Sequence, residues 1–496
     1  MKRLLKWTGW LLLAGVVFGA GFLIGGNFLR KPPPPPPMPT FFSGAESRDV
    51  NIEGERSGRV IDVKEGQLIQ EAVMDASPGD LIRVFPGTYH ETVYVDKSNL
   101  TFQGVIQHGK WPVLDGRDSL NDAFLYSGHF ITIENFTMQN YKGNGIMGQS
   151  GNNFVVRNNR IINTGVYGIF PQFGKNGLIE RNTLSGIADA AIYVGMSDHI
   201  DVRFNEVFEN VAGIEIENCR HALVEYNNVY NNTGGILVFI TPGLPIKTCR
   251  DVIVRNNFVY NNNHENFGAP GSIVSFIPPG SGMVIMAADD VTVENNIIYG
   301  NDNVGIAITD HAFLGSIPAD PESEPNPDRV VLLDNLMFNN GNNPVEEVKV
   351  LMATKFSKRG PDILAIGGGE GSCIRDRARY RTFGLDGYAD CPEISTADVL
   401  SYLLPEPAPE DERTLHDLGK LTWYGVCSGC HAYNIRLIGP PVNALQAMYK
   451  DNPQGVADYI VNPEKRRPDF PEMPPQNYLT AETRLEVARY MLELEE

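Results

Sequence analysis

The 496-residue sequence predicts a mainly β protein, a parallel β-helix, with a small all-α domain at its C-terminus and a membrane-spanning helix at its N-terminus. Two repeated phrases predict the β-helix. The first is an aliphatic residue, two mostly polar residues and Asn, and it ends at Asn159, Asn182, Asn205, Asn227, Asn257, Asn296 and Asn335. The second begins at Gly145, Gly168, Ala191, Gly213, Gly235, Gly282 and Gly305. A period of 22–23 residues with two strand-like stretches and no helical stretch is typical of stacked coils, whereas hairpins give no reason for a fixed period.

The N-terminal residues predict a membrane anchor. Residues 7–29 are apolar and uncharged, which is long enough to cross a bilayer, and basic residues flank them on both sides. A cleavable signal peptide is the alternative for residues 1–31, and both predict that the rest of the chain is exported. Residues 32–50 contain six consecutive prolines and read as a stiff linker.

Residues 51–365 are predicted to form the β-helix. A short amphipathic helix over 66–76, followed by alternating strands, would cover its N-terminal end. Adjacent coils lie about 4.8 Å apart, so the recurring asparagines are expected to hydrogen-bond up the stack. The three longer intervals between asparagines each contain a Pro/Gly-rich insertion, of which residues 258–281 are themselves apolar.

Two stretches carry a family resemblance. The segment VKEGQLIQEAVMDASPGDLIRVFPGTYHETVYVDKSNLTFQG resembles the opening of pectin-lyase-like β-helix proteins of bacterial envelopes. The core, from YGIFPQFGKNGLIERNTLSGIADAAIYVG through VAGIEIENC, is similar to exported bacterial parallel β-helix repeat proteins of unknown activity. The resemblance covers about residues 55–345 and implies a right-handed parallel β-helix.

Alternation within the second phrase predicts one inward and two outward columns of side chains. The inward column is Ile146, Ile169, Ile192, Ile214, Ile236, Met283 and Ile306. The outward columns are Met147, Phe170, Tyr193, Glu215, Leu237, Val284 and Ala307, and Gln149, Gln172, Gly195, Glu217, Phe239, Met286 and Thr309. Such an apolar outer strip predicts a contact.

Three explanations of this strip stay open. The 258–281 insertion folds back over it, the C-terminal domain or another protein docks on it, or it is a polysaccharide groove. In the groove, aromatic rings would stack on sugar faces while Glu215 and Glu217 act as catalytic acid and base. Against sugar chemistry, alginate-epimerase β-helices carry Tyr-Gly-(aliphatic or Phe)-Asp-Pro-His, where this sequence has residues 167–172 as Tyr-Gly-Ile-Phe-Pro-Gln.

Four cysteines lie outside the C-terminal domain. Cys219 and Cys249 each lie eight residues before a ladder asparagine, so they share a corner of consecutive coils and are either buried thiols or a disulfide. Cys373 and Cys391 lie in residues 366–411, which are predicted to be a cap and linker. In an oxidising compartment we expect these two to form a disulfide.

Residues 412–496 contain Cys427-Ser428-Gly429-Cys430-His431. This Cys-x-x-Cys-His motif is the attachment signature of haem c, in which two thiols bond the porphyrin and the imidazole binds the iron. A redox dithiol or a zinc site would not require the adjacent His. A second axial ligand is expected downstream, and Met473 is the candidate.

This domain resembles the small class I c-type cytochromes from about Leu415 onward. Gly419 and Trp423 match the helix before the haem motif, Val487 and Tyr490 match the C-terminal helix that packs on it, and Pro440 matches the proline whose carbonyl holds the proximal His. The resemblance implies one covalently bound haem c with His431 and Met473 on its iron, and outer-sphere electron transfer.

The sequence therefore predicts a membrane-anchored periplasmic c-type cytochrome that passes electrons to redox partner proteins of the envelope, with the β-helix as a scaffold. The alternative is a carbohydrate-active β-helix, a lyase, epimerase or hydrolase, or a polysaccharide-binding one, with an appended cytochrome. In the alternative a polysaccharide is the partner. Nucleic acid is excluded by the net charge of −19 and the lack of a basic stripe.

Overall fold

The computed structural model describes residues Ile52, Gly54 and 56–495, except 271, 312–319, 411–413, 429, 435, 437–438 and 471. Residues 49–496 form one compact unit. The predicted membrane span and proline-rich linker lie outside the described residues. Within the described part of the chain, no helix is both long and apolar enough to cross a bilayer.

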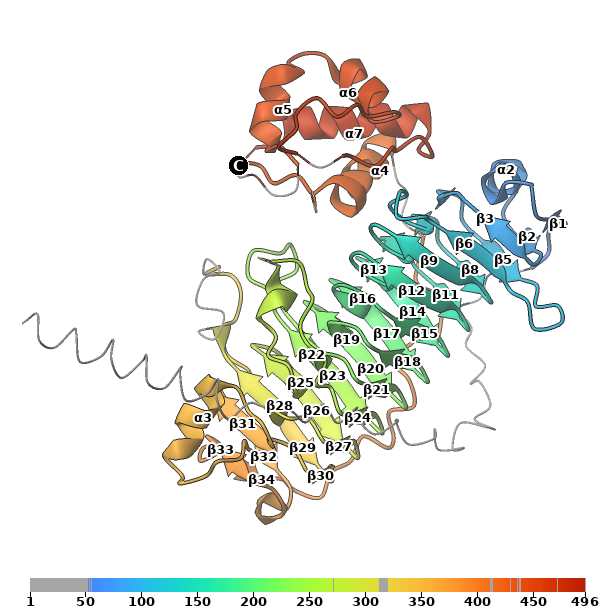
Figure 1. Cartoon of the computed structure of the whole chain (residues 1–496). Helices are drawn as coiled ribbons and strands as arrows, with labels where there is room; N and C mark the ends of the chain where they lie inside the picture. The colour runs from blue at the N-terminus through green and yellow to red at the C-terminus, as the bar shows by residue number, and fades with distance from the viewer. Residues whose placement is uncertain are drawn as a thin grey trace, which may run out of the picture. The chain divides into compact units, whose positions relative to one another are not determined.

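Three long parallel sheets build the β-helix, and each coil contributes one strand to each sheet (Figure 1). Sheet A has 13 strands in the order β1 (Val60–Val63), β2 (Leu81–Val84), β5 (Leu100–Gly104), β8 (Ile131–Glu134), β11 (Phe154–Arg157), β14 (Lys175–Glu180), β17 (Asp198–Arg203), β20 (Arg220–Glu225), β23 (Arg250–Arg255), β26 (Asp289–Glu294), β29 (Val331–Leu333), β32 (Cys373–Ile374) and β34 (Ala389–Asp390). Sheet B has 10 strands, β3 (Gly87–Tyr89), β6 (Pro112–Asp115), β9 (Thr137–Tyr141), β12 (Arg160–Thr164), β15 (Thr183–Ser185), β18 (Glu206–Phe208), β21 (Asn228–Tyr230), β24 (Phe258–Tyr260), β27 (Ile297–Tyr299) and β30 (Leu336–Phe338). Sheet C has 11 strands, β4 (Val93–Val95), β7 (Phe124–Tyr126), β10 (Ile146–Gln149), β13 (Ile169–Gln172), β16 (Ala190–Gly195), β19 (Ala212–Glu217), β22 (Gly234–Phe239), β25 (Ser281–Met286), β28 (Val304–Thr309), β31 (Ile363–Ile366) and β33 (Thr382–Phe383). The parallel β-helix prediction is confirmed.

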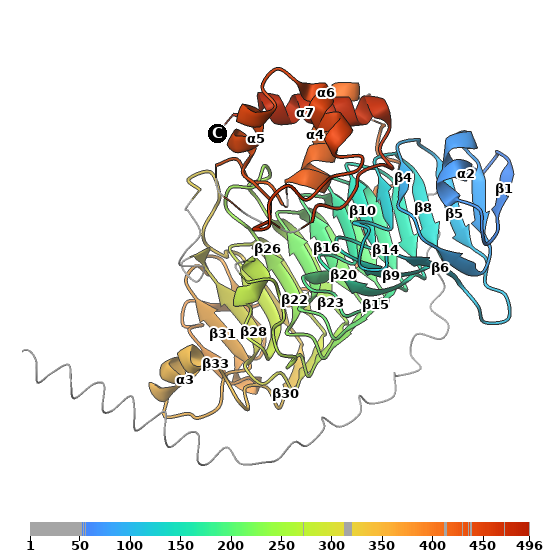
Figure 2. The ribbon, with the colours of Figure 1, turned by 45° about the horizontal axis from the view of Figure 1, so that its top comes forward.

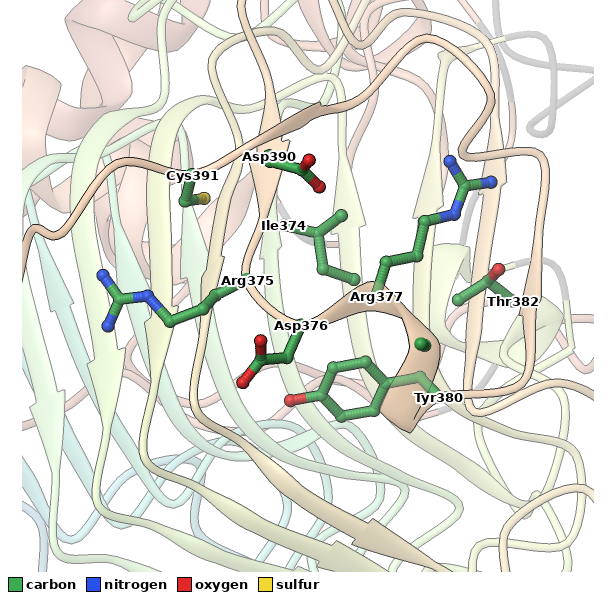
Figure 3. A pocket seen from close by; sticks show the side chains of 9 residues that line it. Ile374, Arg375, Asp376, Arg377, Tyr380, Thr382, Asp390 and Cys391 are labelled. Carbon is green, nitrogen blue, oxygen red and sulfur yellow. The ribbon is translucent and has the colours of Figure 1, made fainter.

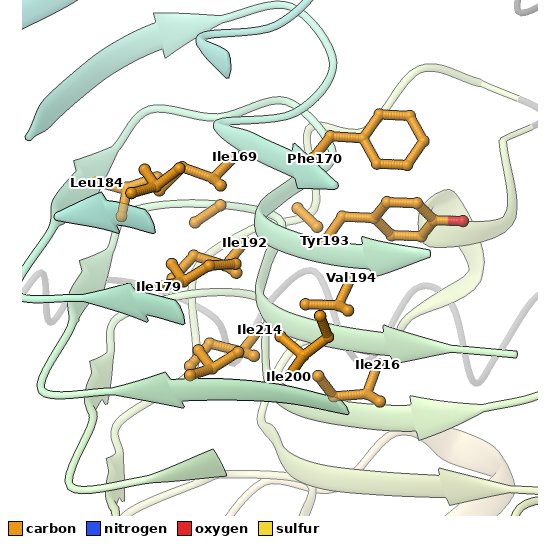
Figure 4. Packing of buried hydrophobic residues seen from close by; sticks show 14 of the residues in the cluster. Ile169, Phe170, Ile179, Leu184, Ile192, Tyr193, Val194, Ile200, Ile214 and Ile216 are labelled. Carbon is orange, nitrogen blue, oxygen red and sulfur yellow. The ribbon is translucent and has the colours of Figure 1, made fainter. Parts of the chain in front are cut away.

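The register of sheet C is the predicted one. Ile146 pairs with Ile169, Ile169 with Ile192, and the column continues through Ile214, Ile236 and Met283 to Ile306. These side chains are buried in the interior, where they pack against residues of sheets A and B (Figure 4). Phe170 and Tyr193 point the opposite way, out of that interior.

The asparagine ladder also forms as predicted. Asn205 Nδ2 donates to Asn227 Oδ1 at 3.0 Å and to the carbonyl of Ile179 at 3.0 Å, and the pattern repeats from Asn159 to Asn335. A second ladder, five residues further along each coil, was not predicted. It joins Asn210, Asn232, Asn262, Asn301 and Asn340 by bonds of 2.9–3.1 Å. Each rung satisfies buried backbone groups at a corner of the coil.

The ends of the β-helix differ. Helix α2 (Ile69–Asp75) covers the N-terminal end as predicted, and the Glu91 carboxylate accepts hydrogen bonds from the backbone N–H groups of Ile69 and Gln70. At the other end, sheet C continues to Phe383 and sheet A to Asp390, and a disulfide joins Cys373 of β32 to Cys391, which directly follows β34. Helix α3 (Glu346–Ala353) and two short 3₁₀ helices, η2 (Ile273–Phe276) and η4 (Arg377–Arg379), lie in the connections.

Residues 392–410, which follow the disulfide, run back along the outer face of sheet A. We call this segment the strap. Glu294 accepts a hydrogen bond from the backbone of Thr396, Asp201 from that of Tyr402, and Asn153 from that of Ala408, so the strap passes from β26 toward β11. Residues 366–411 were predicted to be a cap and linker, but these buried partners make the strap an ordered part of the fold.

The part of the chain that follows the strap carries the remaining helices. They form α4 (Leu415–Thr422), a π-helix η5 (Trp423–Cys427), α5 (Val442–Met448), α6 (Pro453–Tyr459) and α7 (Ala481–Glu493) (Figure 2). Trp423, Val487 and Met491 belong to one buried cluster. A Cβ on Gly419 would come within 2.7 Å of the Glu486 backbone, so α4 and α7 pack closely only because residue 419 is glycine.

Candidate functional site

The outward strip of sheet C is buried by contacts, as its apolar composition predicted. Phe170, Tyr193, Leu237, Phe239 and Met286 are all less than one-tenth exposed. Three segments account for this burial. Gln149 donates to the Leu421 carbonyl of α4 at 3.0 Å, Ile277 of the insertion packs beside Gly234, and α3 packs on Ala307 and Leu364. Two of the open explanations therefore each hold for part of the strip.

A cluster of three carboxyl groups lies in the middle of this strip. Glu215 and Glu217, the predicted catalytic pair, are 1% and 5% exposed on β19. Asp189, which directly precedes β16, was not predicted and faces both glutamates. Tyr193 donates a hydrogen bond from its hydroxyl to Glu217 Oε2, and the ring of Tyr167 stacks on that of Tyr193 with centroids 4.4 Å apart.

The environments of the two glutamates differ. Burial and the charges of Asp189 and Glu217 raise the pKa of Glu215 well above its ordinary value. Burial also raises the pKa of Glu217, but the Tyr193 hydroxyl donates to it, and the hydroxyls of Thr241 and Tyr193 oppose that rise. Glu215 Oε1 and Asp189 Oδ1 have no hydrogen-bond partner among the described residues. The cluster thus favours the protonated form of Glu215 beside a carboxyl at Glu217 that accepts a hydrogen bond.

Asp189 was not predicted from the sequence because it lies outside the repeated phrase. The residue immediately before a strand of sheet C enters the outer face at a corner, and at the corresponding position of other coils the chain carries Val211, Thr233 and Asn303. The sequence feature that could have identified Asp189 is its charge, because the residues at this position of those other coils are apolar or neutral.

The helical segment contains a second candidate site, a cavity of about 300 Å³ whose lining is largely apolar. The predicted residues Cys427, Cys430, His431, Met473 and Trp423 all line it, together with Pro440. His431 Nδ1 donates to the Pro440 carbonyl at 2.8 Å, which leaves Nε2 as the ring nitrogen with a free lone pair. Burial lowers the pKa of His431 and so favours the neutral imidazole.

Two further observations concern how this cavity is built. A Cβ at Gly439 would lie 2.3 Å from the His431 ring, so glycine is required there for the imidazole to fit. Burial raises the pKa of Cys427 to about 12, which disfavours the thiolate that a redox dithiol or a zinc site needs. The donor set and the apolar lining fit a covalently attached porphyrin.

Two further features of the β-helix do not form functional sites. Cys219 and Cys249 are free, fully buried thiols. A polar hollow at the end of the β-helix is lined by Arg375, Arg377 and Tyr380 (Figure 3). Both arginines there are paired, with Asp334 at 2.7 Å and Asp386 at 3.2 Å. The hollow holds no group with a further task.

Comparisons with known proteins agree with the fold. A family model described as a right-handed β-helix region matches residues 98–241 and 239–317. No curated protein matches the chain. Among solved structures, the mannuronan C-5 epimerase AlgE4 A-module of Azotobacter vinelandii matches with 14% identity and a TM-score of 0.45, covering 63% of this chain and 79% of that one.

Two other solved structures are similar. An alginate lyase from Paenibacillus sp. matches with 17% identity and a TM-score of 0.43, over 58% of this chain and 97% of that one. The Dettilon tailspike protein matches with 12% identity and a TM-score of 0.42, over 67% and 68% of the two chains. At these identities the likeness concerns the fold.

These findings correct the functional prediction. The chain was expected to be an electron-transferring cytochrome in which the β-helix is a scaffold, and that prediction is wrong. The family model matches residues of the β-helix, and the three solved structures named above are an epimerase, a lyase and a tailspike. The carbohydrate-directed alternative agrees better with them.

Proposed function

We propose that this protein is a carbohydrate-active β-helix protein that acts on a polysaccharide through the outer face of sheet C. The observation that carries the proposal is the cluster of Asp189, Glu215 and Glu217 with the tyrosines Tyr167 and Tyr193. Burying three carboxyl groups together costs folding free energy, and such an arrangement is found where their chemistry is used.

The differing environments assign roles to the two glutamates. Glu215 keeps its proton near neutral pH and can donate it to a glycosidic oxygen. Glu217 is the carboxylate that acts as base or nucleophile, with its orientation set by the Tyr193 hydroxyl. The rings of Phe170 and Tyr193 contact each other edge to face on the outer side of sheet C, and they can stack on a sugar face once they turn toward a bound chain.

An assay of the purified chain against a panel of neutral and uronate polysaccharides tests this proposal. New reducing ends report hydrolysis, ultraviolet absorbance of unsaturated ends reports a lyase, and proton NMR reports epimerisation. Glu215→Gln and Glu217→Gln should each lower the rate at least about 100-fold. Glu206→Gln, on sheet B, is the matched control and should retain the full rate. Equal rates in the wild type, Glu215→Gln, Glu217→Gln and Glu206→Gln would refute the site.

We further propose that the cavity of the helical segment holds one haem c. Cys427 and Cys430 would carry the thioether bonds, His431 and Met473 would be the axial ligands, and Trp423 and Pro440 would support them. The bond from His431 Nδ1 to the Pro440 carbonyl supports this assignment because it directs Nε2 away from the backbone. Bound there, the group would supply a one-electron redox centre.

Mass spectrometry of the mature chain tests the haem proposal independently of sugar activity. The mass should include one porphyrin, and Cys427→Ala with Cys430→Ala should remove it. Met473→Ala should abolish the sulfur–iron charge-transfer band, while Met74→Ala, at an exposed residue of α2, keeps it. A mature chain without added mass would exclude the assignment.

Residues 52–495 are proposed to lie on the periplasmic side of the cytoplasmic membrane, held there by the N-terminal segment. The Cys373–Cys391 disulfide supports an oxidising compartment. Protease added to spheroplasts should digest the protein, and resistance there with digestion only after lysis would contradict this location.

A further inference from the structure

A group of histidine and aspartate side chains lies on sheet A, away from both candidate sites. His199, His221 and Asp251 occupy the same position on β17, β20 and β23, because Asp198 pairs with Arg220 and Arg220 with Arg250 in the sheet. Asp198 directly precedes His199. One ligand atom from each of Asp198, His199 and His221 lies within 4.8 Å of the others.

We infer that Asp198, His199 and His221 bind a divalent transition-metal ion such as Zn²⁺. In a tetrahedral zinc site with bonds of about 2.0–2.2 Å, ligand atoms lie about 3.3–3.6 Å apart. Asp198 Oδ1 lies 3.7 Å from His199 Nε2 and 2.7 Å from His221 Nδ1. Small side-chain movements would therefore bring these three atoms around one ion.

Hydrogen bonds outside the cluster assign the ligating nitrogens. His199 Nδ1 lies 2.8 Å from the Tyr402 carbonyl, an acceptor, so it carries the proton and Nε2 presents its lone pair. Without an ion, His221 Nδ1 donates to Asp198 Oδ1 at 2.7 Å. A bound ion would replace that proton at Nδ1, and Nε2, 3.5 Å from Asp251 Oδ2, would then carry the proton. Metal-binding imidazoles characteristically donate their second N–H to a carbonyl or a carboxylate, and here each has one in place.

The surroundings leave room for the ion and for one more ligand. The side chains of Asp198, His199 and His221 are 20%, 21% and 34% exposed, so solvent reaches them. Arg220 lies 3.4 Å from Asp198 Oδ2 and leaves Oδ1 to the ion. The two imidazole rings are stacked 8° from parallel, and binding would tilt one of them so that both lone pairs converge. Imidazole nitrogen selects Zn²⁺, Cu²⁺ or Ni²⁺ over Mg²⁺ or Ca²⁺.

The site would also fix the strap. Tyr402 gives its carbonyl to His199, and its hydroxyl donates to Asp251. Tyr402 of the strap therefore contacts the site twice, through its carbonyl at His199 and through its hydroxyl at Asp251. A bound ion would hold the imidazoles in place and slow detachment of residues 392–410 from sheet A.

Titration calorimetry of the chelator-stripped full chain with ZnCl₂ tests the inference. All proteins carry Cys427→Ser and Cys430→Ser, so that the thiols of the helical segment do not bind the ion. His199 and His221 have φ of 60° and 52°, a conformation asparagine tolerates, so His199→Asn and His221→Asn should fold. His108→Asn, at an exposed residue with φ of 52°, is the matched control.

We expect the chain to bind one Zn²⁺ that it does not exchange for Mg²⁺, and each of His199→Asn and His221→Asn to weaken binding at least about ten-fold. His108→Asn should bind as the parent does. Zinc should also slow chymotrypsin cleavage within residues 392–410 in the parent and in His108→Asn alone. Binding that is equal in all four proteins, or absent in the parent, would overturn the site.

Discussion

Glu215 shows how one buried carboxyl links function to stability. Its folded-state pKa lies above the unfolded value, mainly because burial penalises the charged form and then because Asp189 and Glu217 add negative charge. The folded state therefore holds a proton that the unfolded state releases. By linkage, the stability that this proton provides is complete below the unfolded pKa and is lost as pH rises toward the folded one.

We predict that the unfolding free energy of the wild type falls as pH increases above about 4.5, and that Glu215→Gln falls less. The amide mimics the neutral acid and cannot ionise, so the variant should be the more stable protein at pH 8. Guanidinium unfolding followed by circular dichroism at pH 4, 6 and 8 measures this difference. A variant with the same pH slope as the wild type would show that Glu215 ionises freely in the folded protein.

Asparagine at a ladder position satisfies several backbone groups at once. Asn227 Oδ1 accepts from the N–H and the side-chain amide of Asn205, and its own Nδ2 donates to the Val202 carbonyl and to Asn257. Leucine has a similar volume but none of these groups. Each buried polar group left without a partner costs about 1–3 kcal/mol.

Asn227→Leu should therefore lower the unfolding free energy by at least about 2 kcal/mol. Asn342→Ala, which removes one exposed hydrogen bond of 2.7 Å, should change it by less than about 0.5 kcal/mol. Thermal and guanidinium unfolding of the three proteins provide the values. Similar losses in both variants would mean that the ladder adds no more than a surface contact.

At the scale of elements, the repeat could be predicted from the sequence, whereas the segments that pack on the outside of the coils could not. Each coil carries its own copy of the inward isoleucine and of the asparagine, so local sequence determines their register. Ile277, α3 and the strap reach their partners across long stretches of chain, and no periodicity reports such contacts. The sequence therefore predicted a contact on the outer strip without deciding between its possible partners, and it predicted residues 366–411 to be a cap and linker.

Removing one anchor of the strap should free it. Asp201 is fully buried and accepts hydrogen bonds from the Ser401 hydroxyl at 2.6 Å and the Tyr402 backbone at 3.0 Å. Asp201→Ala should raise the rate of proteolytic cleavage within residues 392–410 several-fold, because the segment detaches more often. Asp398→Ala, at an exposed strap residue, should leave the rate unchanged. Equal cleavage of both variants would indicate that the strap is held elsewhere.

At the scale of the whole molecule, charge bears on which polysaccharide is bound. The chain carries a formal net charge of −19, which counts the three carboxyls of the candidate site as ionised. Long-range repulsion opposes the approach of a polyanion, and salt screens it with a Debye length of about 30 Å at 0.01 M and about 8 Å at 0.15 M.

A uronate polymer should consequently bind more tightly at 0.15 M than at 0.01 M salt, whereas a neutral glucan should show no such change. Fluorescence polarisation with labelled oligosaccharides of both kinds gives the two salt dependences. Tighter binding of the anionic oligosaccharide at low salt would reveal a local basic surface that outweighs the net charge.

The central claim is that sheet C around Glu215 and Glu217 receives a polysaccharide. Hydrogen–deuterium exchange of the full chain, with and without an oligosaccharide found to bind, tests it most directly. Protection should concentrate on β16, β19 and β22 and the insertion beside them, and Glu217→Gln should retain that pattern. Protection confined to sheet B or to the helical segment would contradict the account.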